Sequence, residues 1–104
     1  MQFHHGLDSF RGTRAWDSTS LGEVEGATVK VHWTDQPYQW HVNDGAEAFV
    51  VLAGTVDMHW RNASGEHVTR LNAGDACFAN TGDEHVAHPQ GAARILVVEK
   101  KGSV

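Results

Sequence analysis

The sequence has very little cysteine and no long apolar run, and both absences narrow what the protein can be. A single cysteine, Cys77, excludes an intramolecular disulfide and any zinc site built from several thiolates. The longest apolar run, Ala48 to Ala53, is six residues, far short of the ~20 that a membrane-spanning helix needs. The first ten residues lack the basic start and apolar stretch of a signal peptide. We therefore expect a cytoplasmic protein with no membrane partner.

Basic residues are scarce and scattered, with 8 Lys and Arg against 13 Asp and Glu and a net charge of −5. This balance argues against a surface that tracks nucleic-acid phosphates. The sequence also has no Gly-x-Ser-x-Gly elbow and no glycine-rich phosphate loop. Histidine, in contrast, is abundant, with 8 in 104 residues. Because histidine is the commonest metal ligand and a proton carrier near neutral pH, its placement guides the search for function.

The chain is long enough for one domain. Residues 1–26 are polar and punctuated by glycine, which predicts an N-terminal arm that packs a few apolar anchors, and a short edge strand, on the body. Residues 27–104 alternate polar and apolar positions between frequent turn signals, and no segment has a sustained helical period. We predict an all-β domain of seven or eight strands, a sandwich or barrel. The runs that suggest strands are 28–33, 47–53, 55–60, 66–71, 76–79, 84–88 and 92–99.

Strongly coordinating residues fall at separate turns of this β array. Asn43 lies two residues after His41, so on an extended strand both side chains point to the same side. Glu47 continues the face of Phe49 and Val51, which we expect to face the core. A carboxylate in line with core residues is costly unless it is paired or ligated, which predicts that Glu47 binds something. The candidate site residues are His41, Asn43, Glu47 and His85.

The same residues carry a resemblance to the cupin family. The segment from His41 to Glu47, followed by Gly54, resembles the first cupin motif, and the segment from Gly74 through Gly82 to His85 resembles the second. The resemblance covers residues 27–99 and implies a double-stranded β-helix, or jelly-roll barrel, of two antiparallel sheets. Three turn positions depart from the motifs, since Asp35 replaces a glycine, Asn80 a proline and Pro89 an asparagine.

In the family, two histidines and a glutamate of the first motif and the histidine of the second bind a divalent metal. Carried over, this implies His41, Glu47 and His85 as ligands, with Asn43 in place of the second histidine. Two imidazoles and a carboxylate are the ligand set of the facial triad that holds non-haem Fe(II). The amide of Asn43 would be a weak neutral ligand or a partner for metal-bound water. The implied cofactor is a divalent Fe, Mn, Ni or Zn ion, unless the site is a metal-free pocket that binds its ligand directly.

Two function classes remain open. The first is a metal-dependent enzyme acting on a small oxygenated substrate, similar to cupin dioxygenases or sugar isomerases. The second is a non-catalytic module that binds a sugar or a small carboxylate. Aromatic and apolar residues near the site are candidates for the wall of the substrate pocket, although core packing explains them equally well. These residues are Trp33, Tyr38, Trp40, Phe49, Met58 and Trp60.

The remaining histidines are assigned to the surface. His32, His59 and His67 lie among polar neighbours, and His88, three residues after His85, should face the opposite side of the strand. Cys77 is expected to be a small buried apolar residue. A homodimer is expected from the resemblance, and the continuous apolar character of Val50, Leu52, Ile95 and Val97 suggests an extra buried face.

Overall fold

The computed structural model describes residues 1–103, and its regular secondary structure is almost entirely β-strand. Position 104, the last residue of the predicted domain, lies outside the described residues. The only helix among residues 1–103 is the short 3-10 turn Leu7–Ser9, so none in this range is long enough to cross a membrane. The strands are β1 Asp17–Val24, β2 Ala27–Thr34, β3 His41–Val42, β4 Glu47–Ala53, β5 Thr55–Asn62, β6 Gly65–Asn72, β7 Ala76–Ala79, β8 Glu84–Pro89 and β9 Ala93–Lys100.

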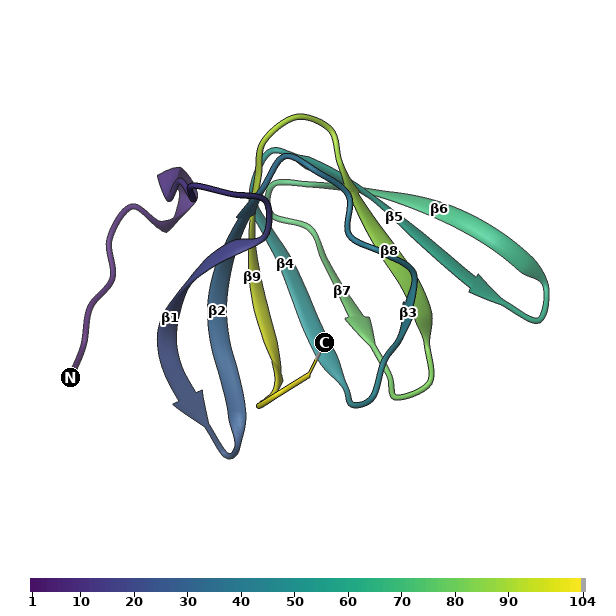
Figure 1. The fold of residues 1–104 in the computed structure, drawn as a ribbon, viewed down its shortest axis with the longest axis horizontal. Helices are drawn as coiled ribbons and strands as arrows, with labels where there is room; N and C mark the ends of the chain where they lie inside the picture. Colours follow the sequence, from purple (N-terminus) through teal and green to yellow (C-terminus); the bar gives the residue numbers. More distant parts are fainter. Residues whose placement is uncertain (104) are drawn as a thin grey trace.

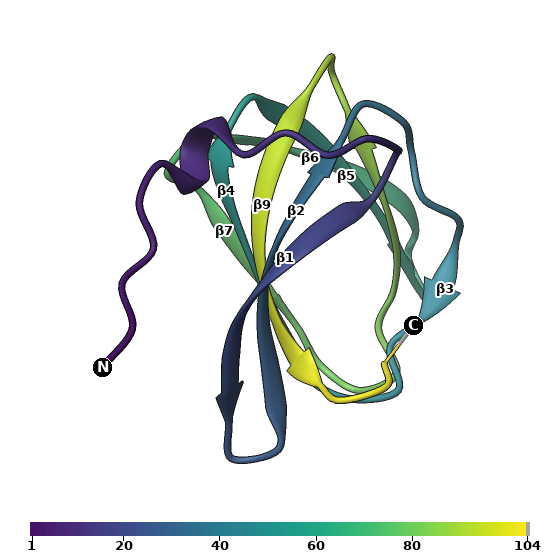
Figure 2. The same ribbon diagram turned by 60° about the vertical axis from the view of Figure 1, so that its left-hand side comes forward.

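The strands form two antiparallel sheets that face each other (Figures 1 and 2). One sheet has the order β1-β2-β9-β4-β7, and the other has the order β3-β8-β5-β6. Figure 1 shows the β5–β6 hairpin reaching beyond the rest of the barrel. This architecture confirms the predicted all-β class with two antiparallel sheets. It adds two strands to the predicted series. The arm contains the full strand β1, and the short strand β3 lies between the predicted runs 28–33 and 47–53.

The hydrophobic core lies between the two sheets. It includes Ile95 and Val97 of β9, which are 0% and 5% exposed. The prediction that these two residues belong to a dimer contact face is therefore wrong. Their neighbours Leu96 and Val98 point to the other side and are half-buried. The homodimer itself stays a prediction. The other buried core residues are Phe49, Val51, Val56, Met58, Leu71, Ala87 and Ala93.

Strand β2 turns its polar residues toward the interior. Directly paired residues of neighbouring strands lie on the same face, and β2 places His32 opposite Ile95 and Lys30 opposite Val97. Its apolar residues therefore face outward, yet Trp33 is only 6% exposed. Two predictions are wrong for this reason: His32 is not a surface residue, and Trp33 does not line the pocket.

The N-terminal segment before β1 covers this outward face. Figure 2 shows it running across the outer side of the five-stranded sheet. The Arg11 guanidinium lies 5.6 Å from the centre of the Trp33 ring. Arg94 of β9 donates a hydrogen bond of 2.8 Å from Nε to the Phe10 carbonyl. The segment thus shields the Trp33 side chain from solvent, which explains why this tryptophan is buried although it points away from the core.

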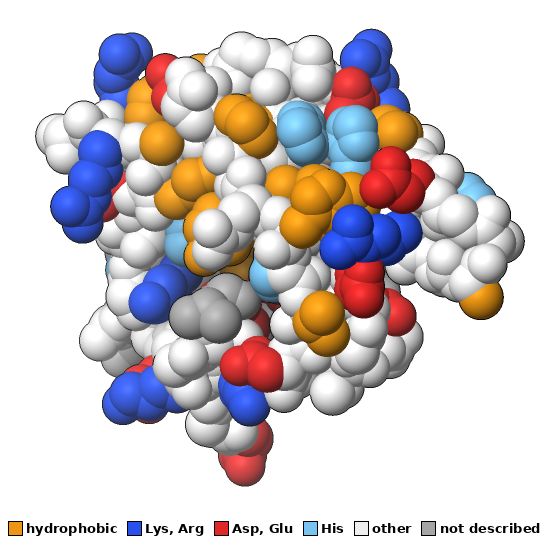
Figure 3. Space-filling view, turned by 45° about the vertical axis from the view of Figure 1, so that its right-hand side comes forward, with side chains coloured by type: hydrophobic (Ala, Val, Ile, Leu, Met, Phe, Trp, Pro, Cys, Tyr) orange, Lys and Arg blue, Asp and Glu red, His pale blue; other side chains and the backbone are white. Residues whose placement is uncertain are grey.

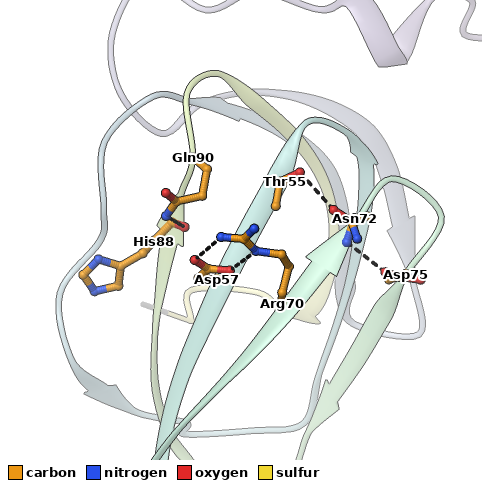
Figure 4. A network of polar contacts seen from close by, with 7 residues as sticks. All are labelled: Thr55, Asp57, Arg70, Asn72, Asp75, His88 and Gln90. Carbon is orange, nitrogen blue, oxygen red and sulfur yellow. Dashed lines mark hydrogen bonds and ion pairs between the residues drawn. The ribbon is translucent and has the colours of Figure 1, made fainter.

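The outer face of the four-stranded sheet is polar. Arg70 and Asp57 form a two-point ion pair, with distances of 2.8 and 3.0 Å (Figure 4), and the Arg70 hydrogen bond lowers the pKa of Asp57. Histidine side chains gather on this side of the molecule beside hydrophobic and basic ones (Figure 3). The rings of His59 and His88 lie 4.1 Å apart here. The prediction that His59 faces outward and that His88 faces away from His85 is confirmed.

Gly54 alone joins β4 to β5 and adopts a φ of +82°, in the left-handed region that favours glycine. The β8–β9 connection packs against it. A Cβ atom at this position would lie 2.4 Å from the Ala92 carbonyl oxygen and 3.0 Å from the Ala93 Cα. The position therefore excludes a side chain for two independent reasons, backbone conformation and space.

Candidate metal and ligand site

Three of the predicted site residues meet at one end of the barrel. Strand β3 pairs with β8 so that His41 lies directly opposite His85, and their ring centres are 4.3 Å apart. Glu47 is the first residue of β4 in the facing sheet. All three line one cavity of about 330 Å³. The fold thus brings together side chains that are up to 44 positions apart in the sequence.

Asn43 contacts this group through His85 and is not itself among the residues that line the cavity. His85 Nε2 lies 2.7 Å from Asn43 Oδ1 and 3.5 Å from Glu47 Oε1. Asn43 and His85 are only 5% and 6% exposed. The backbone holds Asn43 in place, because its N–H donates to Asp83 and its carbonyl accepts from Gly82. Its side-chain Nδ2 is buried without a partner among the described residues.

The two histidines are suited to accept a cation. His41 Nδ1 lies 3.1 Å from the Gln39 carbonyl, so Nδ1–H donates and leaves Nε2 of the neutral ring free. Backbone carbonyls commonly orient metal-bound histidines in this way. Burial and the neighbouring His41 lower the pKa of His85 to about 4. The His85 ring is therefore neutral at physiological pH, as metal ligation requires.

Glu99 is a site residue that the sequence analysis missed. It lies opposite Glu47 in the pairing of β4 with β9 and lines the same cavity. Burial, followed by a side-chain hydrogen bond with Glu99 and its charge, raises the pKa of Glu47 to about 8. A signal was available in the sequence, because Glu99 continues the alternation of Ile95 and Val97 just as Glu47 continues that of Val51 and Phe49.

The remaining wall of the cavity combines aromatic and polar side chains. Tyr38 and Phe49, both predicted, line it, together with Lys30, His32 and Trp16, which were not. The Trp16 ring meets Tyr38 edge-on at 5.3 Å, and Tyr38 meets His41 edge-on at 5.4 Å. Trp16 has a φ of +62°, unusual for a bulky residue, and its Nε1 is buried without a partner among the described residues.

Other predicted pocket residues lie elsewhere. Met58 and Trp60 line a second cavity of about 380 Å³ between β5, β6 and β7, and only His85 of the candidate ligands borders both cavities. Trp40 borders neither of them and instead packs against the Arg61 guanidinium at 4.1 Å. Cys77 lines the second cavity, where burial raises the pKa of its thiol to about 11, so it is no activated thiolate.

The chemistry of the donor set fits a divalent metal, although the donors are not gathered as a finished metal site. Within residues 1–103, no three His, Cys, Asp or Glu side chains form a group that could hold a metal ion as they stand. Two imidazoles and a buried carboxylate nevertheless border one cavity. Beside them, the orphaned Asn43 Nδ2 is an unmet donor to a ligand oxygen. The set suits Fe, Mn, Ni or Zn.

Comparisons with known proteins agree on the fold. No protein-family model matches the chain, and no curated protein matches its sequence. A cupin-2 domain protein from Shewanella frigidimarina is similar in structure, with a TM-score of 0.76, 22% identity, and 86% of this chain and 85% of that chain covered. A cupin superfamily protein from Desulfitobacterium hafniense has a TM-score of 0.71 and 12% identity, over 86% of this chain and 83% of that chain.

An enzyme is also among the similar structures. Hydroxypropylphosphonic acid epoxidase from S. wedmorenis has a TM-score of 0.68 and 17% identity, over 79% of this chain but 49% of that chain. A structure of HppE in its Fe(II) form has a TM-score of 0.67 and 17% identity, over 78% of this chain and 48% of that chain. Together these likenesses show that the chain has the fold of a small single-domain cupin.

Proposed function

We propose that this protein is a metal-dependent cupin that holds a divalent cation with His41, Glu47 and His85 and acts on a small oxygenated substrate. One observation carries the proposal: His85 lies directly opposite His41 in the strand pairing, and its Nε2 is 3.5 Å from Glu47 Oε1. Neighbouring ligands around an octahedral ion with bonds of about 2.1 Å lie about 3.0 Å apart. The distance between His85 Nε2 and Glu47 Oε1 is within about 0.5 Å of that value.

The chain's own residues support an oxygenated substrate. A bound divalent ion would supply Lewis acidity and polarise a substrate or water oxygen. Asn43 Nδ2, buried and without a described partner, can donate to an oxygen bound beside it. Lys30, His32 and Tyr38 add polar groups to the cavity wall. Such groups fix the orientation of hydroxyl, carbonyl or carboxylate groups in a pocket of this size.

Within this class, we favour a reaction that uses dioxygen over a sugar isomerisation. Two imidazoles and one carboxylate are the protein ligands of non-haem Fe(II) oxygenases. The similarity to HppE, a cupin solved with Fe(II), points the same way. An oxygen-dependent activity would be lost under anaerobic handling, whereas an isomerase activity would persist.

A second candidate function is a binding module without catalysis. It is favoured by the hydrogen bond between His85 and Asn43, which occupies His85 Nε2 in the free protein. The raised pKa of Glu47, about 8, also leaves this carboxyl protonated near neutral pH. In this alternative the cavity binds a sugar or a small carboxylate directly.

The metal content of purified, untagged protein tests the proposal. The protein is expressed in medium supplemented with Fe, Mn, Ni and Zn, and wild type is compared with Glu47→Gln. We expect about one metal ion per wild-type chain and a loss of most of it in the variant, because the amide is a much poorer ligand than the carboxylate. Elemental analysis measures both.

The outcomes separate the two candidate functions. A metal that is present in wild type and lost in Glu47→Gln supports the enzyme and identifies the ion for assays. Absence of metal from both proteins, even after incubation with each ion, contradicts the metal-dependent function. Thermal-shift screening with sugars and small carboxylates then tests the binding module.

Metal affinity should depend on pH through Glu47. Its pKa of about 8 means that the free protein holds a proton there at pH 7, and the cation must displace that proton. Affinity therefore rises with pH, by about fivefold between pH 7 and pH 8 for a single group of this pKa. His85, with a pKa of about 4, is already neutral and adds no slope in this range.

Titration calorimetry with Mn²⁺ at both pH values measures the ratio. Repeating the pH 7 titration in buffers of different ionisation enthalpy counts the protons, and we expect about one released per ion bound. An affinity that is the same at both pH values, with no proton released, would show that metal binding does not displace a proton from Glu47.

A further inference from the structure

Two glutamates of neighbouring strands lie side by side inside the barrel. Glu47 of β4 and Glu99 of β9 are directly opposite in the strand pairing and both line the main cavity. Like charges directly opposite each other in a sheet destabilise it. Such a pair needs a proton or a cation between its members.

The described residues supply no such cation. Glu47 has one ion-pair contact, with His85 at 3.5 Å. Glu99 takes part in none of the ion pairs formed within residues 1–103. Lys30 borders the same cavity and forms no ion pair with either glutamate. Within the described chain, neither glutamate is therefore ion-paired with a lysine or an arginine.

A second observation at the same place points to a ligand. Asn43 is 95% buried against His85, which also contacts Glu47, and its Nδ2 has no partner among the described residues. Its Oδ1 is already engaged by His85 Nε2. Asn43 is thus a neutral residue with a hydrogen-bonding role, and it does not replace the metal-binding strength of the imidazole that the cupin motif would place there.

We infer that Glu99 is a further metal ligand, which gives the site two histidines and two carboxylates in place of three histidines and one carboxylate. This inference rests on the proposed metal-binding function. Two carboxylates balance the charge of a divalent ion, and the ion in turn relieves their repulsion. Carboxylates also favour harder ions, so the set should select Mn²⁺ or Fe²⁺ over a softer ion more than a three-histidine site does.

Glu99→Gln tests the inference, with Glu66→Gln as the matched control, because Glu66 is exposed on β6 and away from the cavity. Calorimetry with Mn²⁺ measures affinity, and thermal unfolding measures the stability of the metal-free proteins. We expect Glu99→Gln to weaken Mn²⁺ binding at least tenfold. Its metal-free form should melt at or above the wild-type temperature, because the substitution keeps the shape of the side chain and removes one acidic group from a pair of neighbouring acidic residues. Glu66→Gln should match wild type in affinity.

Each result has one meaning. A Glu99→Gln variant that binds Mn²⁺ as tightly as wild type would overturn the role of Glu99 while leaving the metal-binding function intact. A metal-free variant that melts well below wild type would also overturn it, because Glu99 would then be a structural residue. Wild-type protein that binds no Mn²⁺, Fe²⁺, Ni²⁺ or Zn²⁺ would contradict the proposed function itself.

Discussion

His85→Ala should strip the protein of bound metal, lowering its affinity by at least about 100-fold, more than the loss of a residue that only orients a ligand. His85 is the residue on which the site converges, since its Nε2 faces both Asn43 and Glu47. Its removal deletes a ligand and leaves Asn43 Oδ1 buried without a donor. That unpaired oxygen adds about 1–3 kcal/mol of destabilisation. Elemental analysis and calorimetry measure the affinity, and urea unfolding measures the stability.

His88→Ala is the matched control, because His88 belongs to the same strand and points to the opposite face, where it packs against His59. It should keep metal affinity within about twofold, as expected for a surface substitution remote from the site. Stoichiometric metal in His85→Ala would refute the site. Metal that is lost in His88→Ala and kept in His85→Ala would show that the metal binds through the outer pair of His59 and His88 instead.

Gly54→Ala should destabilise the protein by about 2–5 kcal/mol, the sum of left-handed strain and overpacking. The added methyl group would meet the Ala92 carbonyl oxygen at 2.4 Å in a backbone that holds φ at +82°. Neither contact partner is a flexible side chain that could move aside. A domain of this size is stable by only about 5–15 kcal/mol, so a large fraction of the variant molecules would be unfolded in mild denaturant.

Gly74→Ala separates the two causes. Gly74 also has a positive φ, +96°, but nothing lies within 4 Å of the position of its Cβ. It should lose only the conformational part, about 1–2 kcal/mol. Urea unfolding of both variants gives the difference. Equal destabilisation of the two would mean that the approach of the β8–β9 connection to Gly54 contributes nothing.

The strand pattern, the shared side of His41 and Asn43 and the need of Glu47 for a partner could be anticipated because they depend on short-range rules, whereas the meeting with His85 followed only from the resemblance to the cupin motifs. Period-two alternation places His41 and Asn43 on one side, and a carboxylate in line with Phe49 has to be matched by something. These rules need only the neighbouring residues. They hold wherever one face of a strand is buried and the other is in water.

Strand β2 breaks that condition, because both of its faces are covered. Its apolar side, with Val31 and Trp33, lies under the N-terminal segment, and its polar side, with Lys30 and His32, faces the cavity. Alternation alone identifies two faces but does not say which one points into the barrel. A reader of the sequence therefore assigns Trp33 to the pocket and His32 to the surface, the reverse of what the fold does.

Glu99 was not predicted as a site residue, for a different reason. It lies on the last strand, beyond both motifs, and its role depends on which strand is its neighbour. Only the pairing of β9 with β4 shows that it stands opposite Glu47. The positions of Trp40 and Trp60 also depend on how the strands are arranged in the sheets. That arrangement places Trp40 against Arg61 and Trp60 in the second cavity.

The cavity wall that Trp16 provides comes from a segment that precedes the barrel and belongs to neither motif. Trp16 stands just before β1, and the stretch from Phe10 to Trp16 contains no strand. Residues there take part in no strand pairing of the barrel. Substitution of Trp16 should therefore alter which ligands the cavity accepts, while the strand pairings that position His41, Glu47 and His85 stay unchanged.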